Sequence, residues 1–516
     1  MKTKLILGLL SYGSVICCSA SISGVNDGKE HDMVKRADIN ENVTKESTSK
    51  NAIAKDKNTD SPDAASKKKP SSKSSAEGGD TPRAHPAPKR AALSNIAPPS
   101  FHINIHKVKT ALPQEVWFIP SDKPIVAVSV VFKDAGSKNF SKTHPSLGMF
   151  VSEMLGKGAG KYDKYKFQEA TYDCGASFSL SIDTDHAYVS LWAPDTSYNK
   201  ALELGAIALL DPKLPKSDLN KMKIEEMVGY EEYLQRPEPH LREALNKLFY
   251  PENHPYRASL ERTRKDISQV STDDIRNYLK FLAQNNAYVV VTGPKEKEQE
   301  IVAHIEKMLL QFPLNGVPTV SGTFARNTEL KDAHIEFDVP QSIIAARSDG
   351  FDRKSSGYFA KKLAFAVVAQ PSLHSMIFRE IREKHGLAYR CYGLNIENDL
   401  DSYTYFNIGT KNESTKKAIE ELKKLIGRVH ENGISEEDFD TTKREVLGSL
   451  IVDLDSSSKF VGFVVDKRIR GFSAEQIGDY MSGYASVTLA EANAASKEIF
   501  NPNKLVFISI GKSTGE

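Results

Sequence analysis

A repeat within the chain restricts its fold more than any other feature. The segment KALELGAIALL at Lys200 resembles KAIEELKKLIG at Lys417, an offset of 217 residues. VSTDDI at Val270, with the apolar run AYVVVTG after it, resembles VTLAEA at Val487 and the later KLVFISIG. KSDLNKMKIEE and SEEDFDTTKRE also align, at an offset of about 220 residues. An offset this steady indicates the duplication of a unit about 200 residues long.

Each copy of the repeat mixes apolar strands with amphipathic helices. The clearest patterns predict strands at 125–137, 177–182 and 186–193 and helices at 198–210 and 216–235. Such a mixture predicts an α+β fold made of two homologous α/β-sandwich halves. We place these halves at 101–312 and 332–516, joined by a linker at 313–331.

The first hundred residues differ from the rest of the chain. Two lysines precede an apolar run, Leu5 to Ile16, and small residues follow as far as Ala20. This arrangement predicts a secretory signal peptide over residues 1–20. Residues 21–100 are rich in Lys, Ser, Ala and Pro and nearly lack aromatics, so we expect a disordered tether. The mature chain is predicted to be exported to the periplasm, with no later transmembrane segment.

Charge and cysteine content exclude several functions. The net charge is +2, from 69 basic and 67 acidic residues, so no bulk field favours a nucleic-acid partner. Only Cys174 and Cys391 follow the predicted signal peptide, both in apolar surroundings, which predicts two buried free thiols. No G-x-S-x-G motif is present, and Cys174 has no recognisable base, so a nucleophilic triad is not supported.

One predicted helix has the spacing of a zinc-binding helix but not its ligands. Residues 145–160 read PSLGMFVSEMLGKGAG. At helical spacing, the predicted buried stripe consists of Leu147, Phe150, Val151, Met154 and Leu155. Met149 and Glu153 stand four residues apart on the other side, beside Ser152, as the two ligands and the base do in H-x-x-E-H. A thioether is a poor zinc ligand and a hydroxyl cannot replace a carboxylate base, so no metal is predicted here.

A helix in the second half is predicted over residues 372–384, SLHSMIFREIREK. We expect its buried face to consist of Leu373, Met376, Ile377 and Ile381. Gly386 is expected to end the helix, and Tyr389 to follow on a strand, while Arg382 points away from the apolar stripe. Neither His240 nor His385 has a second ligand at useful spacing, so no independent metal site is expected at either histidine.

Several segments together resemble the pitrilysin/insulinase family of zinc metallopeptidases, over roughly Ile103 to Gly511. They are GMFVSEMLGKGAG, the turn at 173–176, HPYRAS at His254 and SMIFREIREKHGLAY. The family's helix carries H-x-x-E-H, and a distant Glu completes its zinc site. Matched position by position, the motif falls on Met149, Ser152 and Glu153, and the distal Glu falls near Gly229, with Glu225, Glu226 and Glu231 close by. The resemblance therefore implies that every zinc position has changed.

The same resemblance gives a role to Arg382 and Tyr389. They match an Arg/Tyr pair that, in the family, reaches across the cleft to the active site of the other half. A guanidinium and a phenol can hydrogen-bond a substrate carbonyl and stabilise an oxyanion. Small bacterial members occur as two different subunits, one with the zinc motif and the other with only Arg and Tyr. This chain resembles the second kind.

Two hypotheses from different classes follow. The first is a non-catalytic, substrate-positioning subunit of an exported heterodimeric zinc metallopeptidase that cleaves peptides. A homologous partner would then supply the zinc and the Glu base, and this chain would need no cofactor of its own. The alternative is a catalytically inactive binding or scaffold protein that has kept the peptidase fold.

Overall fold

The computed structural model of the chain describes residues 101–111, 114–314 and 316–513. The predicted signal peptide at 1–20 and the predicted tether at 21–100 lie outside these ranges, so both stay predictions. Within the described ranges, no helix combines the length and the apolar character needed to cross a bilayer.

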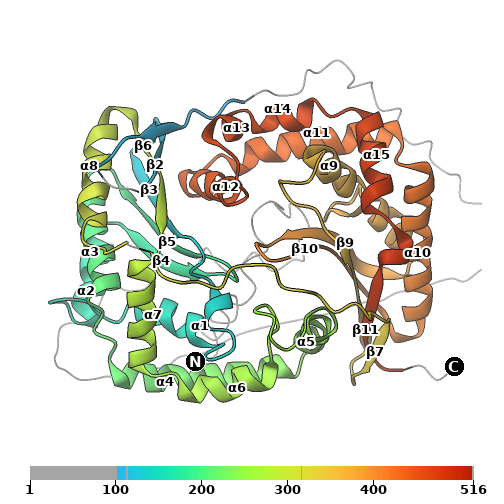
Figure 1. The fold of residues 1–516 in the computed structure, drawn as a ribbon, viewed down its shortest axis with the longest axis horizontal. Coiled ribbons are helices and arrows are strands. Elements are labelled where there is room, and N and C mark those ends of the chain that lie inside the picture. The colour runs from blue at the N-terminus through green and yellow to red at the C-terminus, as the bar shows by residue number, and fades with distance from the viewer. Residues whose placement is uncertain (1–100, 112–113, 315, 514–516) are drawn as a thin grey trace, which may run out of the picture. The chain divides into compact units, whose positions relative to one another are not determined.

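A mixed six-stranded sheet forms the centre of the first half (Figure 1). In spatial order its strands are β1 (His106–Val108), β2 (Val116–Ser121), β6 (Ala287–Pro294), β3 (Ile125–Phe132), β5 (Ala187–Pro194) and β4 (Ser177–Ile182). β2 and β6 are parallel, and all other neighbours are antiparallel. The strand pair predicted from the sequence is confirmed as β4 and β5.

The second half repeats this sheet without its first strand. The order is β7 (Ala333–Glu336), β11 (Val506–Gly511), β8 (Gln341–Asp349), β10 (Ser402–Lys411) and β9 (Ala388–Glu397). β7 and β11 are parallel, as β2 and β6 are in the first sheet, and all other neighbours are antiparallel. One close approach also repeats: a Cβ on Gly136 or on Gly350 would lie 2.3 Å from the backbone of the neighbouring hairpin. The shared topology confirms the predicted α+β fold with two homologous halves.

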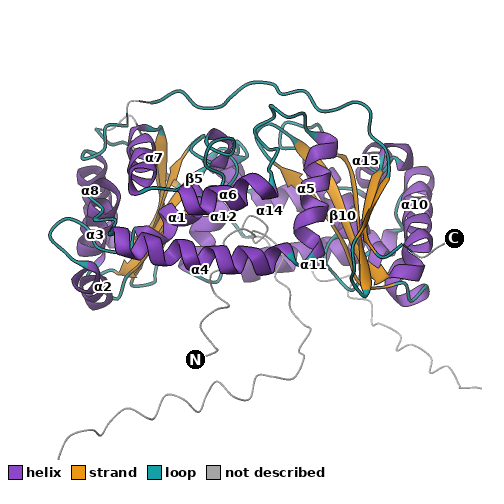
Figure 2. Ribbon diagram, turned by 90° about the horizontal axis from the view of Figure 1, so that it is seen from below, coloured by secondary structure: helices purple, strands orange, loops and turns teal. Residues whose placement is uncertain are grey.

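Helices lie on the outer side of each sheet and also between the two sheets (Figure 2). Those of the first half are α1 (Leu147–Met154), α2 (Lys164–Asp173), α3 (Tyr198–Leu210), α4 (Lys216–Leu234), α5 (Pro237–Phe249), α6 (Leu260–Gln269), α7 (Thr272–Gln284) and α8 (Glu298–Leu309). Those of the second half are α9 (Tyr358–Ala369), the π-helix η6 (Phe378–Lys384), α10 (Thr415–Asn432), α11 (Glu436–Asp453), α12 (Ser457–Ile469), α13 (Ala474–Gly478), α14 (Tyr480–Ala485) and α15 (Leu489–Ile499). Short 3-10 turns occur at Ser137–Asn139, Lys295–Lys297, Asn412–Ser414 and Pro502–Lys504.

Each half also contributes one helix to the sheet of the other half. α5 packs on β8 and β11 of the second sheet, and α12 packs on β3 and β6 of the first sheet. α5 begins at residue 237 and α12 at residue 457, so the two helices occupy equivalent places in the repeat. Each sheet thus packs against a helix from the other half. The predicted domain boundaries, 101–312 and 332–516 with a linker at 313–331, stay a prediction.

An arginine stacked on aromatic rings reinforces each of these contacts. The Arg468 guanidinium of α12 lies 3.9 Å from the ring centroid of Trp117 and 3.8 Å from that of Tyr288, both in the first sheet. Burial lowers the pKa of Arg468 to about 10. At the other contact, Arg347 of β8 lies 4.1 Å from the ring centroid of Phe249 and donates a 2.8 Å hydrogen bond to the Tyr250 hydroxyl. Stacking of this kind combines cation–π attraction with burial of the flat guanidinium.

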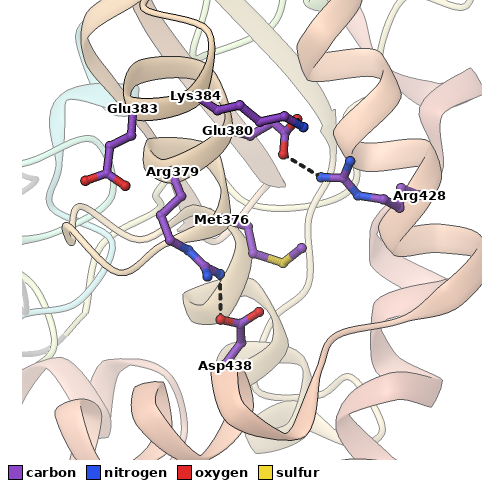
Figure 3. Close-up of a pocket in the computed structure, with 7 residues that line it drawn as sticks. All are labelled: Met376, Arg379, Glu380, Glu383, Lys384, Arg428 and Asp438. Carbon is purple, nitrogen blue, oxygen red and sulfur yellow. Dashed lines mark hydrogen bonds and ion pairs between the residues drawn. The ribbon is translucent and has the colours of Figure 1, made fainter. Parts of the chain in front are cut away.

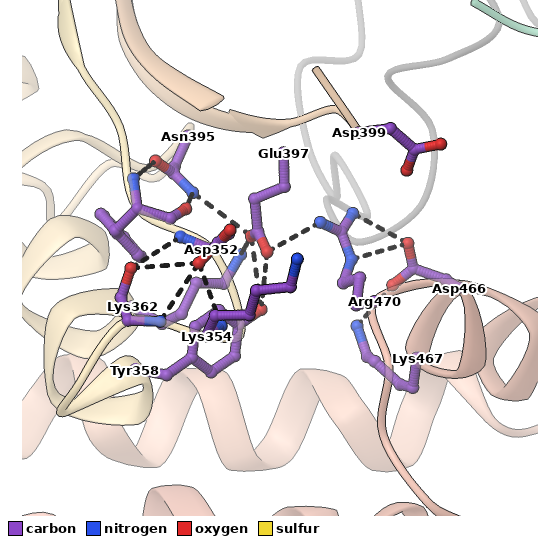
Figure 4. Close-up of polar contacts among 12 residues, drawn as sticks. Asp352, Lys354, Tyr358, Lys362, Asn395, Glu397, Asp399, Asp466, Lys467 and Arg470 are labelled. Atoms are coloured by element: carbon purple, nitrogen blue, oxygen red, sulfur yellow. Dashed lines mark hydrogen bonds and ion pairs between the residues drawn. The ribbon is translucent and has the colours of Figure 1, made fainter. Parts of the chain in front are cut away.

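A buried polar network holds the end of α12 in place (Figure 4). Arg470 forms ion pairs of 2.9 Å with Glu397 and with Asp466. Glu397 also pairs with Lys362, at 3.2 Å. Burial disfavours the charge of Asp466, but Lys467 and Arg470 outweigh that effect and lower the pKa of the Asp466 carboxyl. Because buried charges require partners, this network defines where α12 ends.

Lys138 joins the two halves at a third point. Its buried ammonium lies 2.9 Å from Asp134 and 3.2 Å from Asp185 of the first half, and 3.2 Å from Asp399 of the second. Burial opposes the charge, but the three carboxylates outweigh it and raise the pKa of Lys138. The Tyr256 hydroxyl donates a 2.6 Å hydrogen bond to Asp185. Removing one member of such a group would leave a buried charge unpaired.

We expect Leu245→Ala in α5 to lower the free energy of unfolding by about 2–4 kcal/mol. Leu245 is 7% exposed and belongs to the core cluster of the second sheet. Urea denaturation followed by circular dichroism measures the change. The matched control is Leu310→Ala, because Leu310 is 68% exposed; its effect should stay within about 0.5 kcal/mol. Equal effects of the two variants would contradict the packing of α5 on the second sheet.

Candidate functional site

The helix α1 keeps the apolar face predicted for it. Leu147, Phe150, Val151, Met154 and Leu155 are all buried. The helix is held at its N-terminal end by Asp266 of α6, whose carboxylate accepts hydrogen bonds of 2.9 Å from the Ser146 amide and 2.5 Å from the Ser146 hydroxyl. These contacts place α1 firmly against the first sheet, with its polar face turned away from the core.

The residues on the polar face of α1 do not form a zinc site. Met149 is half-buried and packs against the core of the first half. The Ser152 hydroxyl donates a 3.0 Å hydrogen bond to the carbonyl of Gly148, one turn earlier in the same helix. Glu153 is exposed. A thioether, a hydroxyl engaged by the backbone and one carboxylate do not match the nitrogen, sulfur and carboxylate ligands of zinc. The residues present therefore do not fit the metal of the family.

A second carboxyl group faces Glu153 from α4. Gly229, the predicted distal position, lies on α4 and offers no ligand, but Glu226 lies one turn earlier on the same helix. Burial, with the charges of Glu153 and Glu225, raises the pKa of Glu226 to about 7. The charges of Glu226 and Glu153, in the altered motif, therefore interact. Sequence spacing alone pointed to Gly229.

Arg382 and Tyr389 lie together in the second half. Arg382 Nη1 donates a 2.7 Å hydrogen bond to the backbone carbonyl of Tyr389, and its guanidinium lies 4.9 Å from the ring centroid of Phe378. The Tyr389 ring lies against Gly409 of β10, where a Cβ would approach the ring to 3.2 Å. Both side chains are exposed, Tyr389 at 55%. Among residues 101–111, 114–314 and 316–513, the Tyr389 hydroxyl has no hydrogen-bond partner.

The helix that carries Arg382 differs from the prediction in two ways. Its C-terminal part, after residues 376 and 377, is the π-helix η6, with wider turns than an α-helix. It also begins later than predicted, so Leu373 is 59% exposed and not part of the buried stripe. The reason is the turn after Pro371, which the Ser375 hydroxyl closes with a 2.9 Å hydrogen bond to the Ser372 carbonyl. The predicted end is confirmed, because Gly386 follows η6 with φ +61°.

Two further sequence predictions can be compared with the structure. Cys174 and Cys391 are both buried and free, as predicted. No independent metal site was predicted at His385, because no second ligand stands at useful spacing in the sequence; in the structure its Nε2 lies 3.3 Å from a carboxylate oxygen of Glu380 and 3.3 Å from one of Glu421. Glu421 lies on α10, far from His385 in sequence, so no local spacing could reveal it. His240 Nε2 lies 2.8 Å from the carbonyl oxygen of Leu234, and its ring centroid lies 5.1 Å from that of Phe337.

The fold and the altered helix define a peptidase-type α/β sandwich without its zinc ligands, and comparisons with known proteins agree. The family model "Insulinase (Peptidase family M16)" matches residues 118–264. The model "Peptidase M16 inactive domain" matches residues 269–446. Together these matches cover more than half of the chain, which therefore belongs to the insulinase family, peptidase family M16.

Two relatives of the chain are described differently, one as a protease and the other as a non-peptidase homolog. An "uncharacterized zinc protease YmxG" of Bacillus subtilis is 19% identical over 383 residues, which is 72% of this chain and 89% of the relative. A "non-peptidase homolog YmxG" of Helicobacter pylori is 20% identical over 331 residues, 63% of this chain and 75% of the relative. The crystal structure of a peptidase M16 inactive domain from Pseudomonas fluorescens has a TM-score of 0.71 and 22% identity, covering 80% of this chain and 99% of that one. With its lost ligands, the chain is a catalytically inactive M16-fold protein.

We expect Glu226→Gln to stabilise the protein at pH 8 and to change little at pH 5. The raised pKa of Glu226, about 7, means that the folded state holds a proton that the unfolded state releases near its ordinary pKa of about 4.3. Folding stability contributed by this group therefore falls as pH rises from about 4.3 to 7. Because Glu226 is partly exposed, we expect Glu226→Gln to raise the free energy of unfolding at pH 8 by about 1 kcal/mol.

Urea denaturation at the two pH values tests this expectation. Glu232→Gln serves as the control, because Glu232 is exposed on the same helix and is not among the charges that raise the pKa of Glu226. If Glu226→Gln stabilised the protein equally at pH 5 and pH 8, the carboxyl group would not be protonated in the folded state near neutrality.

Proposed function

We propose that this chain is the substrate-positioning subunit of an exported, two-subunit zinc peptidase. A homologous subunit with an intact H-x-x-E-H helix supplies the zinc and the general base. This chain contributes Arg382 and Tyr389, which bind the carbonyl of a peptide substrate. Support for export comes from the signal-peptide pattern at residues 1–20, and support for the partnership from the match to an inactive domain of the M16 family.

One observation carries the proposal: the zinc face is lost while the Arg/Tyr site remains available. The bond from Arg382 to the Tyr389 carbonyl fixes the guanidinium relative to the strand, and its other donors remain free within the described chain. Tyr389 presents an unpaired hydroxyl on an exposed ring. Donors held in place before substrate arrives stabilise developing negative charge without the cost of reorganisation.

A scaffold role is the second candidate, favoured by the description of the Helicobacter pylori relative as a non-peptidase homolog. In that case the Arg382–Tyr389 contact serves only to join η6 to β9. No donor function would then be needed, and no zinc-bearing partner would be activated.

We expect Arg382→Ala to lower kcat/KM of the assembled two-subunit enzyme about 100-fold, since loss of one oxyanion donor typically costs about 100- to 1,000-fold. Tyr389→Phe removes only the hydroxyl and should cost about tenfold or more, roughly the 1.4 kcal/mol of one hydrogen bond. Both are measured as peptide hydrolysis by the complex, after co-elution of the subunits has been verified.

The matched control removes a positive charge elsewhere. Lys417→Ala lies on the exposed side of α10 and should leave kcat/KM unchanged. Unchanged hydrolysis by an assembled Arg382→Ala complex would exclude the positioning role and favour the scaffold.

A further inference from the structure

We propose that Glu380, His385 and Glu421 form a binding site for a divalent cation of the zinc type, which links η6 to α10. The site is separate from α1 and does not depend on the proposed function. Its residues come from two elements: Glu380 lies in η6, His385 directly after it, and Glu421 in α10. One ligand atom from each of the three lies within 4.8 Å of the other two.

The distances suit tetrahedral coordination. His385 Nε2 lies 3.3 Å from Glu380 Oε1 and 3.3 Å from Glu421 Oε2. Zinc binds imidazole nitrogen and carboxylate oxygen at about 2.0–2.2 Å, so ligand atoms around a tetrahedral ion are separated by about 3.3–3.5 Å. One imidazole and two carboxylates leave a fourth position for water, although the two carboxylates also form ion pairs with Lys384, Arg428 and Lys424.

The backbone holds these ligands in place. The His385 amide donates a 3.2 Å hydrogen bond to the Glu380 carbonyl, a five-residue turn that brings the two side chains to the same side. The three side chains are 14%, 23% and 12% exposed, in the order Glu380, His385, Glu421. They are sheltered enough to be ordered and open enough for an ion to enter. A charged pocket of about 510 Å³ lies on the side of Glu380 and is also lined by Lys384 and Arg428 (Figure 3).

The carboxylate oxygens that face away from His385 have partners of their own. Arg428 pairs with Glu380 Oε2 at 2.9 Å, and Lys424 pairs with Glu421 Oε1 at 2.7 Å. Outer partners of this kind orient metal ligands in known sites. The side chains of Arg428 and Lys424 are 45% and 66% exposed, so water screens their repulsion of a bound cation.

One competing cation must move. Lys384 Nζ lies 2.6 Å from Glu380 Oε1, the oxygen assigned to the metal. The Lys384 side chain is 61% exposed, and an ion pair made by such a solvated ammonium contributes little stability. An incoming dication can therefore displace it at small cost.

The other group of metal-type ligands in the described chain gives a contrast. Asp185, His186 and Asp399 also lie within 4.8 Å of one another. There the buried Lys138 ammonium lies between the two carboxylates, 3.2 Å from each, and its side chain is 1% exposed. Because Lys138 cannot leave without unfolding its surroundings, that group carries no proposal.

Isothermal titration of the mature, full-length protein with Zn²⁺ at pH 7.5 tests the proposal. We expect one site that His385→Ala weakens at least 100-fold and Glu421→Gln weakens at least tenfold. Lys384→Gln should tighten binding several-fold, because it removes the competing cation. A network of ion pairs without a metal function predicts no such gain. His374→Ala is the control: this histidine is 53% exposed and outside the cluster.

Substitution by Co²⁺ gives a second readout, since a tetrahedral site yields intense visible absorption bands that His385→Ala should abolish. Two results would overturn the proposal: no Zn²⁺ binding at millimolar concentration, or binding that His385→Ala and Glu421→Gln leave unchanged in folded protein. The second would assign the zinc to surface histidines elsewhere.

Discussion

Arg468 lies between two aromatic rings of a sheet that belongs to the other half of the chain, and the rest of the structure depends on this contact and its counterpart. The counterpart is Arg347, stacked on Phe249 and bonded to Tyr250. A β-sheet with helices on one face only would leave the other face open to water. Here α5 and α12 close those faces reciprocally, so the halves form one structure although each descends from the same unit.

This arrangement explains why the altered helix α1 persists. Its apolar stripe faces the first sheet and contributes to the core, whereas the positions of the zinc ligands range from half-buried Met149 to exposed Glu153. Stability and catalysis therefore use different sides of one helix, and loss of the ligands leaves packing intact. What replaced them is informative: Ser152 bonds within its own helix, and Glu226 shares its surroundings with Glu153. Neither change recreates a metal site, so any chemistry must come from elsewhere.

The local pattern of apolar and polar residues was enough to predict much of this fold. The repeat offset can be read directly from the sequence. The β4–β5 pair and the buried stripe of α1 could be predicted because they depend on neighbours in sequence. The start of the η6 helix was placed too early because a turn after Pro371 removes Leu373 from its stripe. The exchange of α5 and α12, the interaction of Glu226 with Glu153 and the grouping of His385 with Glu421 depend on tertiary contacts, which spacing along the chain does not contain.

The most direct test of the account is peptide hydrolysis by this chain alone, by the homologous zinc-motif subunit of the same cell alone, and by both together. Zinc content is measured in each preparation, and co-elution establishes assembly. The account predicts that hydrolysis requires both chains, with the catalytic zinc bound by the partner. Full activity of the partner alone, unchanged when this chain is added, would contradict it and leave a scaffold or binding role.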